Sequence, residues 1–139
     1  MSVMSRSSAP SPIVIDASAL VELLLQSATG KRVAATVNTT ELIAPDLANP
    51  EVMQSLRGLE RSGQITAARA ARALRRLIES DIARIPTRVL LQEAWKLRSN
   101  LSAYDASYVA LARMLHCPLL TTDRPLTRAP GLAVTLICV

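Results

Sequence analysis

Short apolar runs alternate along this chain with longer stretches in which apolar residues recur every three or four positions. Five such runs predict short β-strands, at residues 13–15, 42–44, 82–85, 118–122 and 133–137. The periodic stretches between them predict helices, at residues 18–27, 31–37, 50–61, 66–80, 89–100 and 102–116. Continuous apolar runs are typical of strands buried on both faces, and strands that alternate with helices predict a parallel α/β sheet.

Capping residues mark where several of these helices begin and end. Gly30 is a plausible stop for the first helix. Asn49, followed by Pro50 and an acid, reads as a helix start, with Asn49 as the capping residue. Thr66 is the expected cap of the helix at 66–80, and Ser102 is the expected start of a capping box.

Four carboxylates occupy the edges of these elements. Asp16 and Asp123 each follow an apolar strand, whereas Glu51 and Asp105 each lie in the first turn of a predicted helix. Ligands of parallel sheets bind beyond the carboxyl ends of the strands. If the four acids converge there, they cannot all stay ionised without a cation, because like charges raise one another's pKa. Oxygen ligands of this kind suit Mg²⁺ or Mn²⁺.

Each acid also has a purely structural interpretation. Asp16 can cap the next helix, and Asp123 can begin a turn. Glu51 and Asp105 can interact favourably with a helix dipole, by about 0.3–1 kcal/mol each. Four acids in this order nevertheless favour a metal site over four separate caps. Asp46, in the loop before Glu51, is a further candidate for the same site.

The charge of the chain indicates an anionic partner. Its 139 residues include 16 Lys and Arg against 11 Asp and Glu, which gives a net charge of +5. Eight arginines fall within one third of the chain, at positions 57, 61, 69, 72, 75, 76, 84 and 88. Arg69, Arg72 and Arg76 share one helical face, which predicts either a solvated face or contacts with phosphates or a protein partner.

Aromatic side chains are scarce, with one Trp, two Tyr and no Phe. We therefore expect base stacking to contribute little and selectivity to come mainly from loops and backbone. Tyr104 and Tyr108 lie four residues apart, and we expect both to pack against the core. The single histidine, His116, lies at a predicted helix end, which gives little support to a Ser-His or Cys-His mechanism.

Several other classes of protein fit the sequence poorly. Cys117 and Cys138 lack zinc-site spacing and are expected to be buried free thiols. No apolar run approaches the roughly 18 residues of a membrane span, so a cytoplasmic protein is expected. Residues 1–12 are rich in Ser and Pro and predict a disordered leader, followed by a single domain over residues 13–139. An aspartyl phosphotransferase would need a late lysine, and the chain has only Lys31 and Lys96.

Three segments resemble motifs of the PIN-domain nucleases, and their order and spacing resemble the VapC toxins of bacterial toxin–antitoxin pairs. They cover residues 14–20, 101–108 and 119–126. The resemblance implies a PIN-like three-layer α/β fold, with a central, mainly parallel sheet of about five short strands flanked by helices. It implies a catalytic and metal-binding quartet, with one or two Mg²⁺ or Mn²⁺ ions held by Asp16, Glu51, Asp105 and Asp123. Ser18 and Thr121 match supporting polar positions. Gln54 stands where the family often has Asn.

The same resemblance implies an endoribonuclease that leaves a 5′-phosphate and a 3′-hydroxyl. The expected role is that of a toxin that inhibits translation by cutting structured RNA, either tRNA or rRNA. A homodimer and a small VapB-like antitoxin are the expected partners, and the arginine face at 69–76 resembles the region that receives the antitoxin. Two alternatives remain open: a PIN-domain RNA-processing nuclease without an antitoxin, and a non-catalytic α/β binding module whose acids are caps.

Overall fold

A five-stranded parallel sheet forms the centre of the protein, as the computed structural model shows for residues 12–139. The strands run in the order β3-β2-β1-β4-β5, and every neighbouring pair is parallel. Their bounds are Ile13–Ile15 for β1, Leu42–Pro45 for β2, Ala83–Ile85 for β3, Leu119–Thr121 for β4 and Leu136–Cys138 for β5. The expected α/β class is confirmed. The predicted leader falls almost entirely on residues 1–11, which lie outside the described part of the chain.

The most apolar strands lie in the middle of the sheet. In β1, Val14 and Ile15 are fully buried, and Val14 pairs with Ile43 of β2 while Ile15 pairs with Leu120 of β4. The outer strands β3 and β5 are partly exposed. This gradient follows from the order of the strands, because only central strands are covered by helices on both faces and by a neighbouring strand on each side.

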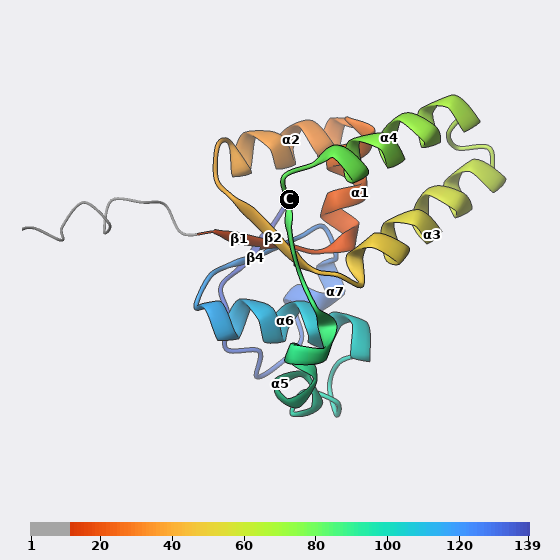
Figure 1. Cartoon of the computed structure of the whole chain (residues 1–139). Coiled ribbons are helices and arrows are strands. Elements are labelled where there is room, and N and C mark those ends of the chain that lie inside the picture. The colour runs from red at the N-terminus through yellow and green to blue at the C-terminus, as the bar shows by residue number, and fades with distance from the viewer. Residues whose placement is uncertain (1–11) are drawn as a thin grey trace, which may run out of the picture.

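Helices cover both faces of the sheet and give three layers (Figure 1). One layer contains α1 (Ala17–Leu25), α2 (Ala28–Val37) and α4 (Ala67–Glu79), with α3 (Ala48–Arg61) and α4 forming an arm that extends beyond the sheet. The other layer contains α5 (Leu91–Trp95) and α6 (Ala103–Leu115). A 3₁₀ helix at Thr87–Leu90 precedes α5, and the short helix α7 (Arg124–Thr127), which the sequence did not predict, follows β4.

Gly30 does not end the first helix, so that prediction is wrong. The helix α1 ends at Gln26, whose backbone is left-handed with φ 55°, and Ser27 caps α2 by accepting from the Gly30 backbone N–H at 2.9 Å. A Cβ atom on Gly30 would lie 1.9 Å from the carbonyl oxygen of Glu22. The glycine therefore permits the close approach of α2 to α1, which is a packing role and not a turn.

Asn49 does not cap α3, which is a second correction. The helix already begins at Ala48, and the Asn49 side chain instead accepts a 3.3 Å hydrogen bond from Nε of Arg84. The predicted helix at 89–100 is also shorter than expected. Beyond Trp95 the backbone N–H groups bond three residues back, as Leu97 does to Ala94 at 2.9 Å, which converts the helix into successive tight turns.

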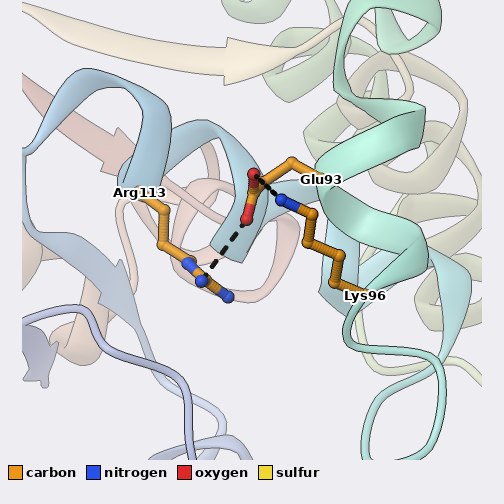
Figure 2. Close-up of polar contacts among 3 residues, drawn as sticks. All are labelled: Glu93, Lys96 and Arg113. Atoms are coloured by element: carbon orange, nitrogen blue, oxygen red, sulfur yellow. Dashed lines mark hydrogen bonds and ion pairs between the residues drawn. The ribbon is translucent and has the colours of Figure 1, made fainter.

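A three-residue charge cluster holds α5 against α6. Glu93 accepts a hydrogen bond from Lys96 at 3.1 Å and forms an ion pair with Arg113 of α6 at 3.3 Å, and Figure 2 shows its carboxylate between the two cations. Pairs as exposed as these contribute about 0–1 kcal/mol each. Their main consequence is orientation, since Arg113 restrains the short α5 segment that carries Trp95.

Two further expectations concern the cysteines, which were predicted to be buried free thiols, and the absence of a membrane-spanning segment. Cys117 is buried and free as expected, but Cys138 is exposed because it lies on the edge strand β5, so the expectation of a second buried thiol is wrong. Across residues 12–139, every helix is too short or too polar to cross a lipid bilayer.

Candidate active site at the carboxyl ends of the central strands

Asp16 is the most enclosed acid of the protein, with 6% of its surface exposed. It follows β1 directly and serves as the N-cap of α1, where Oδ1 accepts from the Ala19 backbone N–H at 3.0 Å. Oδ1 also accepts from the Ser18 hydroxyl at 2.7 Å, and Oδ2 accepts from the Thr121 hydroxyl. Both sides of the carboxylate are thus fixed before any ligand binds.

The residues expected to support the site join β1 to β4. Ser18 accepts from the Thr122 backbone N–H at 3.1 Å, and Thr121 accepts from the Asp123 backbone N–H at 2.9 Å. These contacts exist because β4 pairs directly with β1, although the two strands are more than a hundred residues apart in sequence. In the sheet, β2 lies on one side of β1 and β4 lies on the other, so β1 stands where the order of the strands reverses. Ligands of α/β sheets bind at such topological switch points.

The other three acids also lie at helix N-termini. Glu51 is in the first turn of α3, Asp105 is in the first turn of α6, and Asp123 caps α7 by accepting from the Leu126 backbone N–H at 3.4 Å. Asp105 follows Ser102, which caps α6 as expected and accepts the Asp105 backbone N–H at 3.1 Å. Asp16 and Asp123 therefore cap a helix while Glu51 and Asp105 lie in a first turn, and in both positions the helix dipoles offset part of the mutual repulsion.

Repulsion between like charges connects the four acids, although burial is the larger cause of each raised pKa. Burial is the main cause that raises the pKa of Asp16, and the charge of Asp123 raises it further. Burial likewise raises the pKa of Glu51, with smaller contributions from Asp105 and Asp16. The pKa of Asp105 is raised by burial first, then by Asp123 and Asp16. Capping alone would stabilise the charged forms and lower these values, so burial together with the neighbouring like charges outweighs it.

Among residues 12–139, no basic side chain forms an ion pair with any of the four acids. The two ion pairs found among residues 12–139 both involve Glu93 and none of the four acids. Within the same range, no three Asp, Glu, His or Cys side chains are drawn together as a compact ligand cage. The donor set nevertheless fits a hard divalent cation, because it consists entirely of carboxylate and hydroxyl oxygens.

Tyr108 is a site residue that sequence reasoning did not assign. Its side chain is 2% exposed, and its hydroxyl donates a 2.6 Å hydrogen bond to Oε1 of Glu51. The prediction that Tyr108 packs in the core is confirmed, but the polar contact with Glu51 was missed. The sequence could have indicated this role, because Tyr108 lies three residues after Asp105 and the two side chains therefore share one face of α6.

Tyr104 does not pack against the core, so that prediction is wrong. It is 62% exposed and lines an open hollow together with Ala17, Glu51 and Gln54. Gln54 therefore borders the site region from the next turn of α3. Asp46 accepts hydrogen bonds from the hydroxyl and the backbone N–H of Thr87, and these bonds lower its pKa.

Two arginines of the predicted binding face are engaged within the protein. Arg69 donates to the carbonyl oxygen of Leu25 at 3.1 Å, and Arg76 donates to that of Leu24 at 2.8 Å. Both bonds satisfy carbonyl groups at the C-terminus of α1, where cations are favoured. Arg72, which lies between them in sequence, remains exposed.

The model of the family described as "PIN domain" matches residues 13–132. The chain belongs to the PIN domain family. Among its relatives is Ribonuclease VapC9 of Mycobacterium tuberculosis, which is 40% identical over 111 residues that cover 80% of this chain and 85% of the relative.

Solved structures share the same fold. PAE2754 from Pyrobaculum aerophilum superposes with a TM-score of 0.62 at 26% identity, covering 91% of this chain and 83% of that one. VapC20 of Mycobacterium tuberculosis, described as a Sarcin-Ricin loop cleaving toxin, gives a TM-score of 0.60 at 20% identity over 83% of this chain and 92% of its own. The PIN-like fold expected from the motifs is thereby confirmed.

Proposed function

We propose that this protein is a divalent-metal-dependent endoribonuclease that acts as the toxin of a VapBC-type toxin–antitoxin pair. The observation that carries the proposal is the buried Asp16 carboxylate, which is electrostatically linked to the other three acids and has no ion-pair partner among residues 12–139. Membership of the PIN domain family and 40% identity to a VapC ribonuclease support the same activity. Residues 13–139 would act as one nuclease domain.

Asp16 and Asp105 are the proposed direct metal ligands, with Glu51 and Asp123 completing the set. Bound Mg²⁺ or Mn²⁺ would lower the pKa of a water molecule and neutralise charge on the phosphate oxygens. Ser18 and Thr121 would hold Asp16 in place for this task, since both already donate to its carboxylate oxygens. Tyr108 would do the same for Glu51.

Hydrolysis would proceed by attack of water on the phosphorus atom of an RNA backbone. The new P–O bond forms as the bond to the 3′ oxygen breaks, and the departing 3′ oxygen takes a proton from solvent water, which leaves a 5′-phosphate and a 3′-hydroxyl. The acids of the cluster would accept the proton of the attacking water, a role that fits carboxylates whose pKa is raised. Structured RNA, either tRNA or rRNA, is the proposed substrate.

Arginines outside the cluster would hold the RNA, because the acidic site itself repels phosphates. Arg72 is the proposed phosphate contact of α4, since Arg69 and Arg76 already donate to carbonyls of α1. The exposed part of this helix face is also a proposed contact for a small VapB-like antitoxin. A homodimer in the cytoplasm is the proposed working form.

Cleavage of total RNA by the purified protein tests the proposal. Wild type with Mg²⁺ or Mn²⁺ is expected to give discrete fragments carrying 5′-phosphates, and the double variant Asp16→Asn, Asp105→Asn is expected to give none. Mn²⁺ should raise the melting temperature of wild type and not of the double variant, because a site present only in the native state stabilises it. Full activity in the double variant would reject the proposal.

Expression in cells separates the toxin from its alternatives. A toxin arrests growth and is rescued by a co-expressed antitoxin, whereas an RNA-processing nuclease cleaves RNA without arrest. A binding module would show neither cleavage nor a shift with Mn²⁺, and its acids would then be helix caps.

A further inference from the structure

An apolar groove borders the acidic cluster on the side of α5 and α6. It has a volume of about 390 Å³, within the range of roughly 300–1,000 Å³ typical of ligand sites. Its walls include Leu47, Leu91 and Ala106, and two large aromatic side chains, Trp95 and Tyr104. A groove of this kind needs an occupant, because both aromatic rings are largely exposed, Trp95 by 66% and Tyr104 by 62%.

The groove and the candidate active site are continuous. Tyr104 and Leu47 line this groove and also line the open hollow that contains Ala17 and Glu51. Tyr104 is moreover the residue immediately before Asp105. A molecule that reaches the acidic cluster therefore passes next to the groove.

The chemistry of the groove matches a nucleobase. The guanidinium carbon of Arg98 lies 4.6 Å from the centre of the Trp95 ring, so a cation and an aromatic ring are already stacked. Proteins bind unpaired RNA bases by stacking them on aromatic rings and on guanidinium planes, and arginine also neutralises nearby phosphates. Two of the three aromatic residues of the chain are placed here, in contrast to the expectation that stacking contributes little.

The groove is also held in shape before binding. Trp95 ends the short helix α5, and Arg113 of α6 reaches Glu93 of the same helix at 3.3 Å (Figure 2). Arg98 donates at 2.9 Å to the carbonyl oxygen of Trp95, which fixes the guanidinium beside the indole. A preformed stacking site loses less entropy when a base enters it.

We infer that this groove, lined by Trp95, Arg98 and Tyr104, binds an unpaired nucleobase of the RNA substrate next to the cleavage site. The inference rests on the proposed ribonuclease function and adds a subsite to it. The subsite explains how RNA binds beside an acidic cluster that repels its phosphates. It also favours single-stranded or looped segments, because a paired base cannot enter.

Trp95 is the single tryptophan of the chain, so its fluorescence reports on the groove directly. The experiment titrates wild type with a short unstructured RNA in metal-free buffer, where no cleavage occurs. Saturable quenching of Trp95 is expected. An abasic ribose-phosphate oligomer of equal length is expected to cause no quenching at any concentration.

Variants locate the contact. Trp95→Ala and Tyr104→Ala are each expected to weaken binding of a labelled RNA by about 5- to 150-fold, as loss of one stacking contact does. Tyr104→Phe keeps the ring and is expected to bind as wild type does. Met114→Ala, which removes another exposed apolar side chain of α6, is the matched control and should also bind normally. Unchanged melting temperatures would verify that every variant is folded.

Three results would overturn the inference, and they differ in whether the proposed ribonuclease function also fails. If wild type cleaves RNA with metal but Trp95 is not quenched, or Trp95→Ala binds normally, the subsite is wrong and the proposed function stands. If wild type neither binds nor cleaves any RNA, the proposed function fails and the subsite with it. If Trp95 emission changes with protein concentration alone, the groove is an interface between copies of this chain.

Discussion

The hydroxyl of Tyr108 donates a 2.6 Å hydrogen bond to Oε1 of Glu51, across 57 residues of sequence. The bond joins the first turn of α3 to α6, the helix that carries Asp105. It favours the charged form of Glu51, but burial outweighs it and the pKa of Glu51 remains raised. Tyr108 therefore orients a carboxylate that is still able to take up a proton or a cation.

Tyr108→Phe tests this orientation. The change keeps the ring in the core and removes the donor, so we expect about 0.5–1.5 kcal/mol less stability and roughly 10–100-fold less nuclease activity or metal affinity. Cleavage rates over a Mn²⁺ titration, together with a melting curve, measure both. Tyr104→Phe is the control, since no hydrogen bond is found for its exposed hydroxyl within residues 12–139. Wild-type activity at every Mn²⁺ concentration would show that Tyr108 serves packing alone.

Asp16→Asn should change how stability depends on pH in metal-free buffer. Because the pKa of Asp16 is raised from 3.8 in the native state, the native protein binds more protons than the unfolded chain just above that value. Wild type therefore loses stability as the pH rises from 3.8 towards the raised pKa. Above the raised pKa, Asp16 causes no further change in stability. The variant lacks this loss, so its stability relative to wild type should grow over the same window.

Asp46→Asn provides the control of opposite sign. The bonds from Thr87 lower the pKa of Asp46, so its stabilising effect is present above 3.8 and is lost as the pH falls towards the lowered value. This variant should be less stable than wild type at neutral pH and equal to it in acid. Urea unfolding over a pH series in the presence of a chelator measures both variants. Parallel curves for Asp16→Asn and wild type would contradict the predicted desolvation of Asp16.

Arg76→Met should destabilise the contact between α4 and α1. Its guanidinium donates at 2.8 Å to the carbonyl of Leu24, and hydrogen bonds from charged groups contribute about 1.5–3 kcal/mol. Because Arg76 is partly exposed, its hydrogen bond contributes towards the lower end of that range. We expect a loss of about 1–2 kcal/mol in the free energy of unfolding. Arg75→Met, at the exposed neighbouring position, should change stability by less than about 0.5 kcal/mol. Equal losses in the two variants would show that overall charge, and not this contact, matters.

Gly30→Ala should lower the stability of the folded protein, whereas Gly58→Ala should not. A Cβ on Gly30 meets the carbonyl oxygen of Glu22 at 1.9 Å, so α2 must move away from α1 at a cost of about 1–3 kcal/mol or more. Gly58 lies inside α3 with open space around it, and alanine there should stabilise the protein by roughly 0.5–1 kcal/mol. Thermal unfolding of both variants checks the contrast. A neutral Gly30→Ala would mean that the two helices tolerate wider spacing.

The sequence by itself determined the features that depend on near neighbours. The apolar runs of β1 and β4, the helix starts at Thr66 and Ser102 and the helix end at His116 all appear where the pattern predicts them. Four acids at element ends, read with the family motifs, led to the PIN-like fold. These features can be predicted from the sequence because strand periodicity and helix capping involve residues only a few positions apart.

Tertiary structure alone decided which of these residues meet. The pairing of β4 with β1 brings Thr121 to Asp16 across 105 residues, and the packing of α6 against β1 and β2 places Tyr108 where it meets Glu51. Tyr104 of α6 stays exposed, and the packing of α4 against α1 brings Arg76 to the Leu24 carbonyl, neither of which the local pattern specified. The physical reason is that a side chain's partner depends on strand order and helix packing, which are set by burial over the whole chain and not by local propensity.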